Sequence, residues 1–385
     1  MHMGVQWVAA HRAAMVSPYD GLSFTKPRGG FSGRTVRQVV HLHRGGPQLR
    51  VWLSNQFGSG PLRIGEARVG RHLGGGRIAE DQIRLSFGGS KSVEIVAGTE
   101  VVSDLTDFEV PDDAELAISL YVVEDSGLAT NHPEALQTGY VAAGNTAADP
   151  EPGLAEEIAS LYWIKGVDLR LERSGDEPVV AAFGDSLTDG SGTTPGAHQR
   201  YPDHLSRRLG LPVLNLGIGG NRLLRNGFGP AGLLRFQPDV LSVPGLTHVI
   251  IALGINDLGL PAMLGQPKTG AEEMIAGFTT LARLAREAGV APIGATLPPY
   301  AGTTFPGYHS EKGDRIREAV NDWIRRTPEY HACLDIDAAV RDPERPSRFH
   351  PDLHCGDGLH PNDEGARAMA HAIGLDAFLT RRVSR

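Results

Sequence analysis

From about residue 34 to residue 145, apolar and polar residues alternate with a period of two. Within 49–54, for example, the apolar positions Leu49, Val51 and Leu53 alternate with Arg50, Trp52 and Ser54. Such alternation is typical of strands that bury one face. Clusters of Gly and Pro separate these runs, as at 45–47 and 58–61. Short strands joined by such turns predict an antiparallel β-sandwich or jelly roll.

After about residue 172 the pattern changes, and apolar strand-like runs alternate with helical patterns. We expect strands at 178–183, 212–216, 248–253, 291–297 and 333–336. The helices between and after them carry apolar stripes, which are Met274, Phe278, Leu281 and Ala285, then Ile316, Val320, Trp323 and Ile324, then Ala366, Met369, Ala370 and Ile373. The last helix is expected to start at the N-cap Asn362. Near-continuous apolar strands separated by helices predict a parallel sheet covered on both faces.

These two patterns divide the 385 residues into two domains. We expect a β-rich, jelly-roll-like N-terminal domain over 1–172, which is an accessory domain or forms part of the substrate rim, and an α/β domain over 173–385. The Pro- and Gly-containing segment from about 146 to 177 is the expected junction. A chain of this length is ordinarily built from two such units.

Composition excludes several classes of protein. The net charge of −8 and the pI near 6.0 argue against a nucleic-acid partner, because proteins that bind nucleic acids normally have an excess of basic residues. No apolar run approaches the roughly 18 residues of a membrane span. With only Cys333 and Cys355, a disulfide framework is excluded, although one bridge between them stays open.

The sequence gives an expectation for the location of the protein but none for its assembly. The N-terminal residues lack the pattern of a signal peptide, so we expect a cytoplasmic protein, with secretion after removal of a leader as the alternative. The oligomeric state has no signal in the sequence.

Polar clusters follow four of the predicted strands. They are Gly184-Asp185-Ser186, Gly219-Gly220-Asn221, Gly254-Ile255-Asn256-Asp257 and Asp357-Gly358-Leu359-His360-Pro361. Ligands of doubly wound sheets bind beyond the carboxyl ends of the strands. Each cluster alone is also explained by a turn, a helix cap or a loop hydrogen bond. Their joint occurrence, each in the right strand context, favours a catalytic site.

In these clusters the sequence resembles the SGNH hydrolase superfamily, also called GDSL esterases and lipases. All four of its blocks occur in order from about Val179 to the C-terminus, and Gly217–Arg222 resembles bacterial two-domain members with a β-rich N-terminal domain. The resemblance implies a flavodoxin-like three-layer α/β/α fold with a parallel sheet. It implies Ser186 as nucleophile, with Asp357 and His360 as its triad partners. It also implies an oxyanion hole formed by the Ser186 and Gly220 backbone N–H groups and the Asn256 side-chain amide.

The chemistry explains why these residue types are needed. A serine hydroxyl needs a base that accepts its proton, and an adjacent carboxylate orients that base. We therefore expect a serine ester hydrolase that forms an acyl-enzyme on short-acyl esters, such as acetyl esters of carbohydrates or small metabolites. The alternatives are an acyltransferase with the same site and a non-catalytic carbohydrate-binding protein. No organic cofactor and no metal is expected.

Other residues carry weaker hypotheses. A metal site among His350, Asp352, His354 and Cys355 is less favoured than ordinary loop histidines, because a close pair of Cys ligands is missing. The aromatic groups in 298–308, Tyr300 and Phe305 above all, are candidates for an acyl or leaving-group pocket. Arg222 and Arg225 contact substrate or solvate a helix. Four aromatic residues of the N-terminal domain stack on sugars or lie in the core, namely Trp52, Tyr121, Tyr140 and Trp163.

Overall fold

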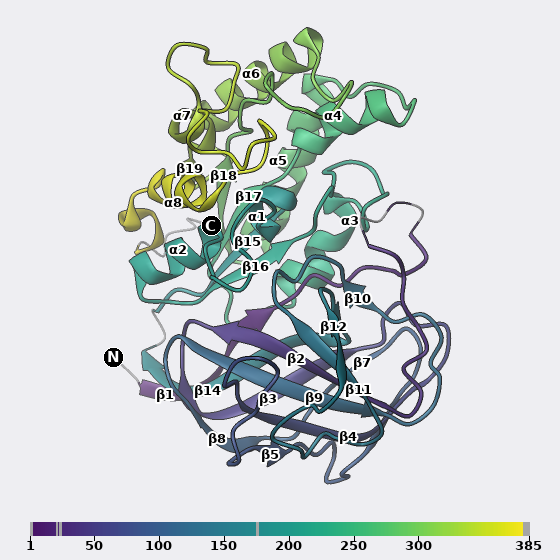
Figure 1. Ribbon diagram of the computed structural model, residues 1–385. Coiled ribbons are helices and arrows are strands. Elements are labelled where there is room, and N and C mark those ends of the chain that lie inside the picture. Colours follow the sequence, from purple (N-terminus) through teal and green to yellow (C-terminus); the bar gives the residue numbers. More distant parts are fainter. Residues whose placement is uncertain (1–2, 21, 23–24, 175–176, 380–385) are drawn as a thin grey trace. The chain divides into compact units, whose positions relative to one another are not determined.

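The computed structural model describes residues 3–20, 22, 25–174 and 177–379 (Figure 1). The chain forms two compact units, Met1–Glu177 and Pro178–Arg385. The strand β14 (Ile164–Ser174) therefore extends across the position between 172 and 173 at which the sequence pattern changes.

The N-terminal unit is built from antiparallel sheets, and its described residues include no helix. One sheet has the order β1-β14-β3-β7, with β8 beside β3; its other strands are β1 (Met3–Arg12), β3 (Gly46–Ser54), β7 (Glu100–Val102) and β8 (Thr106–Val110). The other has the order β12-β11-β2-β9-β4-β5, with β6 beside β4; its strands are β2 (Arg34–Leu42), β4 (Leu62–Arg71), β5 (Ile83–Arg84), β6 (Val93–Ile95), β9 (Ala114–Val122), β11 (Gly139–Ala143) and β12 (Ala155–Ile158). A short pair joins β10 (Asn131–His132) to β13 (Leu161–Tyr162). The predicted β-rich fold is confirmed.

Alternation along the strands accounts for the core of this unit. In β3, Leu49, Val51 and Leu53 are fully buried, whereas Arg50 and Trp52 on the opposite face are partly exposed. The whole of β8 follows the same rule, with every second residue buried. One face of each strand therefore supplies apolar area to the core.

The boundary between the two units falls at the end of the expected junction 146–177, and most of this segment belongs to the N-terminal unit. This segment contains β12, β13 and β14, and β14 lies between β1 and β3 in the first sheet. Its alternation from Val167 to Leu171 is that of a half-buried strand, and the Gly and Pro residues before it mark turns rather than a linker. Asp168 within β14 is fully buried and binds the side chains of Arg12, Arg50 and Trp52.

The C-terminal unit contains a five-stranded parallel sheet with the order β16-β15-β17-β18-β19. Its strands are β15 (Val180–Gly184), β16 (Val213–Gly217), β17 (His248–Ala252), β18 (Ala291–Ala295) and β19 (Ala332–Leu334). All five predicted strands are confirmed to within a few residues. In this flavodoxin-like order the chain leaves β15 toward one side and later returns to its other side, so the loops after β15, β16 and β17 meet at one edge.

Helices flank this sheet in two groups (Figure 1). The first group packs together as α2 (Tyr201–Leu209), α7 (Ile336–Val340) and α8 (Asp363–His371). The second consists of α3 (Gly232–Phe236), α4 (Ile255–Met263), α5 (Ala271–Glu287) and α6 (Glu311–Arg326). The remaining helical segments are α1 (Ser186–Asp189), η1 (Gln237–Leu241) and η2 (Leu375–Phe378). The three-layer α/β/α prediction is confirmed.

The predicted helix faces hold for α5 and α8 but shift in α6. The apolar stripe of α5 is fully buried, and the Asn362 side chain caps α8 by accepting from the Gly365 N–H at 2.9 Å. In α6, Ile316 and Trp323 are only partly buried, whereas Arg317 and Asn321 are fully buried. Buried polar groups of this kind need partners, and Arg317 forms an ion pair with Asp337 at 2.7 Å.

Candidate active site

The polar clusters predicted at the carboxyl ends of the strands lie where the fold brings loops together. Ser186 is the first residue of α1, and only Asp185 separates it from the end of β15. The Asp185 side chain caps this helix by accepting from the Leu187 N–H at 3.1 Å. Because the first N–H groups of a helix have no intrahelical acceptor, the Ser186 N–H is available as a donor beside its own hydroxyl.

A chain of hydrogen bonds joins the three residues of the predicted triad. Ser186 Oγ lies 2.9 Å from His360 Nε2, and His360 Nδ1 lies 2.6 Å from Asp357 Oδ2. The second Asp357 oxygen accepts from the Leu359 and His360 N–H groups, each at 2.8 Å. One carboxylate thus shapes the loop and also orients the imidazole. Their catalytic roles remain a prediction that the geometry fits.

The charge of Asp357 is stabilised by the same contacts. Burial acts to raise its pKa, but the hydrogen bonds from the His360 ring and from the backbone N–H groups of His360 and Leu359 outweigh burial. The pKa of Asp357 is therefore held well below its ordinary value. A carboxylate that stays ionised stabilises the imidazolium that forms when His360 accepts a proton.

Gly220 occupies the loop after β16 in a backbone conformation that favours glycine, with φ of +72°. A Cβ at this position would lie 2.6 Å from the Phe228 ring. The absence of a side chain thus lets the Phe228 ring pack against the backbone of the predicted oxyanion donor.

Asn256, the third predicted oxyanion donor, lies in the first turn of α4 and is 4% exposed. Its amide Nδ2 donates to the Asn221 carbonyl at 3.0 Å, and its Oδ1 accepts from the Tyr308 hydroxyl at 2.8 Å. An amide nitrogen carries two hydrogens, so one remains for a substrate oxygen. The Tyr308 hydroxyl, by donating to Oδ1, fixes which end of the amide presents nitrogen.

Comparison with known families agrees with the resemblance that these residues carry. Residues 182–368 match the model of the GDSL-like lipase/acylhydrolase family. The C-terminal unit is a GDSL-like lipase/acylhydrolase domain. The protein is accordingly a carboxylic ester hydrolase. Among curated proteins, no match to the sequence was found.

Several solved structures are similar to the chain. In each comparison about half of this chain matches most of the other protein. One is a carbohydrate acetylesterase from Sinorhizobium meliloti, with 20% identity, 52% of this chain and 97% of that chain covered, and a TM-score of 0.40. Another is a GDSL-like lipase from Bacteroides thetaiotaomicron, with 20% identity, 51% and 85% covered, and a TM-score of 0.39. A third is an aryl esterase of M. smegmatis, with 18% identity, 50% and 94% covered, and a TM-score of 0.41.

In the GDSL-like domain, a buried arginine that the sequence analysis missed holds the loops together. Arg235 of α3 is 2% exposed and donates to the carbonyls of Gly184 at 2.7 Å and Leu216 at 2.9 Å. It also donates to Asn221 Oδ1 at 2.9 Å. One guanidinium therefore ties the ends of β15 and β16 to the loop that carries Gly220. The only feature of the sequence that could have indicated this role is the charge of Arg235 within an otherwise apolar five-residue helix.

We expect Tyr308 to be a positioning residue rather than a catalytic one, so that its removal lowers kcat of the GDSL-like domain selectively. In Tyr308→Phe the amide of Asn256 keeps its place but loses the donor that fixes its orientation. We expect kcat for ester hydrolysis to fall about 10-fold with KM changed less than about twofold, because the amide acts on the transition state. Steady-state kinetics on one ester measures both constants. A rise in KM at unchanged kcat would contradict the positioning role.

Two buried carboxyl groups flank the triad. Burial raises the pKa of Asp185 to about 7, although the Leu187 N–H acts in the opposite direction. Burial likewise raises the pKa of Asp257 to about 6. The N–H groups of Leu223 and Leu224 donate to its oxygens at 2.6 and 3.0 Å and act to lower this pKa. Both groups are thus protonated more readily in the folded chain than in the unfolded one.

Asp185→Asn is expected to make the stability of the GDSL-like domain less dependent on pH. A carboxyl whose pKa is raised on folding stabilises the fold fully below its unfolded pKa, and this contribution is lost as pH rises through about 7. Asn keeps an acceptor for the Leu187 N–H but does not ionise. Urea unfolding at pH 5 and pH 8 measures how much unfolding free energy is lost between these two pH values. This loss should be smaller in the variant than in wild type, by about 1 kcal/mol or more. Equal losses in both proteins would contradict the raised pKa.

The remaining predictions have mixed outcomes. Cys333 and Cys355 are free, so the bridge left open above is not formed. His350 Nδ1 accepts from the Asp352 N–H and His354 Nδ1 from the Gly356 N–H. Among the residues described, this loop does not bring three metal-ligating atoms together.

The two aromatic groups of the pocket hypothesis lie in different environments, and for Phe305 the hypothesis stays a prediction. Tyr300 is fully buried, so its role in a substrate pocket is wrong. Phe305 is 37% exposed, and its ring lies 6.0 Å from that of His360 in an edge-to-face arrangement. Arg222 is also buried, with its guanidinium bonded to Gln266 at 2.5 Å and to the Asn226 carbonyl. Trp163 is core, with no exposed surface.

The described helices include none with the length and hydropathy that crossing a lipid bilayer requires.

Proposed function

We propose that the protein hydrolyses short-acyl esters, acetyl esters above all, of carbohydrates or small metabolites, through an acyl-enzyme on Ser186. The hydrogen-bonded chain from Ser186 through His360 to Asp357 carries this proposal. A serine without a base at hydrogen-bond distance would be a poor nucleophile.

The residues divide the reaction into two halves. His360 Nε2 accepts the Ser186 proton as Oγ bonds to the acyl carbon, and the carbonyl electron pair moves onto oxygen. The Ser186 and Gly220 N–H groups and the Asn256 amide donate to that oxyanion. The intermediate then expels the alcohol, which takes the proton from His360. Water attacks the acyl-enzyme with His360 again as base, and the acid and free Ser186 are released.

The preference for a small acyl group is supported by the packing around Gly220. The Phe228 ring occupies the volume where a Gly220 side chain would lie, directly beside a donor of the predicted oxyanion hole. An acyl chain bound through its carbonyl oxygen at this donor has a phenyl ring next to it. Crowding of this kind favours acetyl over long acyl chains, because overpacking costs free energy.

The alcohol side is supported by the place of Phe305. His360 must protonate the leaving alcohol, so that group binds next to the imidazole. Phe305 lies edge-to-face against the His360 ring and keeps part of its surface exposed. Its ring offers an apolar surface on which a sugar ring or an aryl alcohol can pack.

An ester panel on wild type, Phe228→Ala and Phe305→Ala tests both sides of the site. We expect Phe228→Ala to shift the kcat/KM profile toward longer acyl chains at constant alcohol. Phe305→Ala should instead lower kcat/KM for sugar and aryl alcohols about 10-fold at constant acetyl. Unchanged profiles in both variants would contradict the assignment of these rings.

Two controls separate the alternatives. Added alcohols or amines in the same assay detect acyl transfer, since they would appear in the product in place of the free acid. A fluorophosphonate that failed to label Ser186 would favour the non-catalytic carbohydrate-binding protein.

A further inference from the structure

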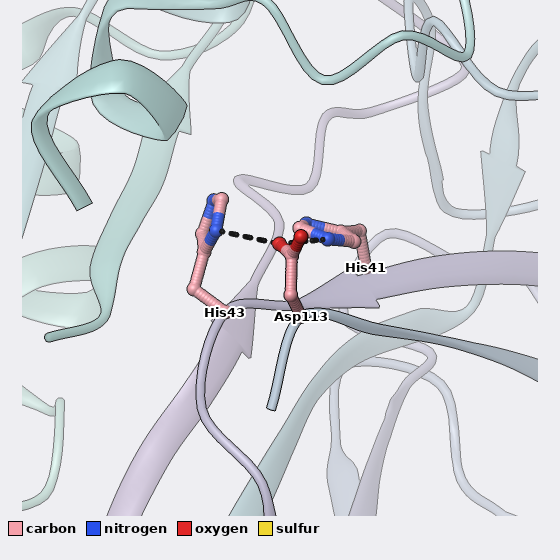
Figure 2. A group of neighbouring side chains, drawn as sticks. All are labelled: His41, His43 and Asp113. Atoms are coloured by element: carbon pink, nitrogen blue, oxygen red, sulfur yellow. Dashed lines mark ion pairs between the residues drawn. The ribbon is translucent and has the colours of Figure 1, made fainter. Parts of the chain in front are cut away.

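The N-terminal unit contains a group of side chains that the esterase chemistry does not use. His41, His43 and Asp113 point toward one another at the end of the second sheet (Figure 2). One nitrogen of each histidine and a carboxylate oxygen all lie within 4.8 Å of one another. We propose that these three residues bind one divalent transition-metal ion of the Zn²⁺ class.

Strand pairing explains how these residues meet although about seventy positions separate them. β2 pairs antiparallel with β9, with Leu42 opposite Ala114. One step further along this register, His43 lies opposite Asp113, whose N–H donates to the His43 carbonyl at 3.4 Å. Residues two apart share one face of a strand, so His41 points to the same side as His43 while Leu42 is fully buried on the other.

The distances from the two imidazole nitrogens to the carboxylate oxygen are close to those between ligands of a tetrahedral ion. His41 Nε2 lies 2.9 Å and His43 Nδ1 lies 3.5 Å from Asp113 Oδ1. Zinc bonds of about 2.0–2.1 Å to nitrogen and oxygen place adjacent tetrahedral ligands about 3.3 Å apart, between these two values. The two imidazole planes are nearly perpendicular, at 87°, with their centres 4.4 Å apart. Both rings therefore face the carboxylate without stacking on each other.

Burial and chemistry suit the same ion. The side chains of His41 and His43 are only 9% and 11% exposed, whereas that of Asp113 is 63% exposed. Two imidazoles held in place and one carboxylate open to solvent form a three-ligand set, with a fourth position left for water. Imidazole with carboxylate favours Zn²⁺ and its neighbours over Ca²⁺, which takes six to eight oxygen ligands. The expectation from sequence that no metal binds did not consider this set, because its members come from two segments that are far apart in the sequence.

Metal binding to the full chain tests the proposal after chelator treatment and dialysis. Isothermal titration with ZnCl₂ is expected to show one site with a micromolar or lower Kd. That site should weaken at least about 10-fold in His41→Ala, His43→Ala and Asp113→Asn. The chain has 15 histidines, so the difference from wild type, rather than total zinc, is the measure.

His72→Ala is the matched control. His72 belongs to the same unit and also faces a carboxylate, with Nδ1 2.6 Å from Glu115 Oε2, but no second histidine completes a group with them among the residues described. This variant should leave the Zn²⁺ affinity unchanged. An equal loss in His72→Ala and His41→Ala would overturn the proposal.

Cobalt gives an independent reading on the unaltered chain. Co²⁺ replaces Zn²⁺ in four-coordinate sites and then absorbs strongly in the visible range, so wild type should show this band and His43→Ala should not. Two results would show that the group is only an ion pair closing the turn. One is a weak, six-coordinate spectrum in wild type, and the other is an equal zinc affinity in wild type and all three cluster variants. A wild type without the four-coordinate band overturns the proposal even where a variant fails to fold, and the loss of the band in a folded His43→Ala assigns it to this group.

Discussion

Ser186→Ala is expected to lower kcat for ester hydrolysis by about 10⁴-fold or more, the largest effect among the substitutions considered. In the proposed mechanism this hydroxyl is the group of the triad that bonds to the acyl carbon, and its Oγ lies 2.9 Å from His360 Nε2. Without it, His360 has no nucleophile to deprotonate except water. Fluorophosphonate labelling should disappear in the same variant.

Loss of folding must be separated from loss of chemistry in this experiment. Ser186 is 6% exposed and its replacement removes one oxygen, so the melting temperature should stay within a few degrees of wild type. Ser191→Ala, five positions further along, removes the same group outside the triad and should keep most of the activity. If Ser186→Ala retained a tenth of wild-type turnover, Ser186 would not be the nucleophile.

The sequence predicted the parts of this molecule that local patterns determine. The five parallel strands are nearly continuous apolar runs. Ser186, Gly220 and Asn256 lie within a few residues of the ends of β15, β16 and β17, where ligands of such sheets bind, whereas Asp357 and His360 come from the loop between α7 and α8. The hydrogen bonds among Ser186, His360 and Asp357 then follow from the fold, because parallel strands deliver their loops to one edge.

Contacts between distant segments could not be predicted in the same way. Tyr308 binds Asn256 across 52 positions, and nothing in its neighbourhood distinguishes it from Tyr300 or Phe305. Three aromatic residues of one irregular segment thus have three different environments, set by the helices packed around them. The same limit hid β14, whose partners β1 and β3 lie more than a hundred residues before it.

Asn256→Ala is expected to lower kcat by about 10²–10³-fold with a much smaller change in KM. In the proposed mechanism the amide donates to the oxyanion of the transition state, whereas the neutral ester carbonyl of the bound substrate needs it less. Steady-state constants on the best ester of the panel measure the separation. A rise in KM at constant kcat would show that Asn256 binds substrate rather than the oxyanion.

Burial complicates this substitution, because alanine leaves the Tyr308 hydroxyl without the acceptor it has at 2.8 Å. An unsatisfied buried hydroxyl costs about 1–3 kcal/mol of stability, so urea unfolding of each variant must accompany the kinetics. The double variant Asn256→Ala/Tyr308→Phe removes both groups of the bond. Its unfolding free energy should recover part of the loss seen in Asn256→Ala.

The same double variant tests whether Tyr308 acts through Asn256. If the tyrosine only orients the amide, Tyr308→Phe lowers kcat about 10-fold in wild type but has no further effect once Asn256 is alanine. Independent roles would instead make the two losses multiply. A kcat for the double variant about 10-fold below that of Asn256→Ala would therefore place Tyr308 in contact with the substrate or the oxyanion itself.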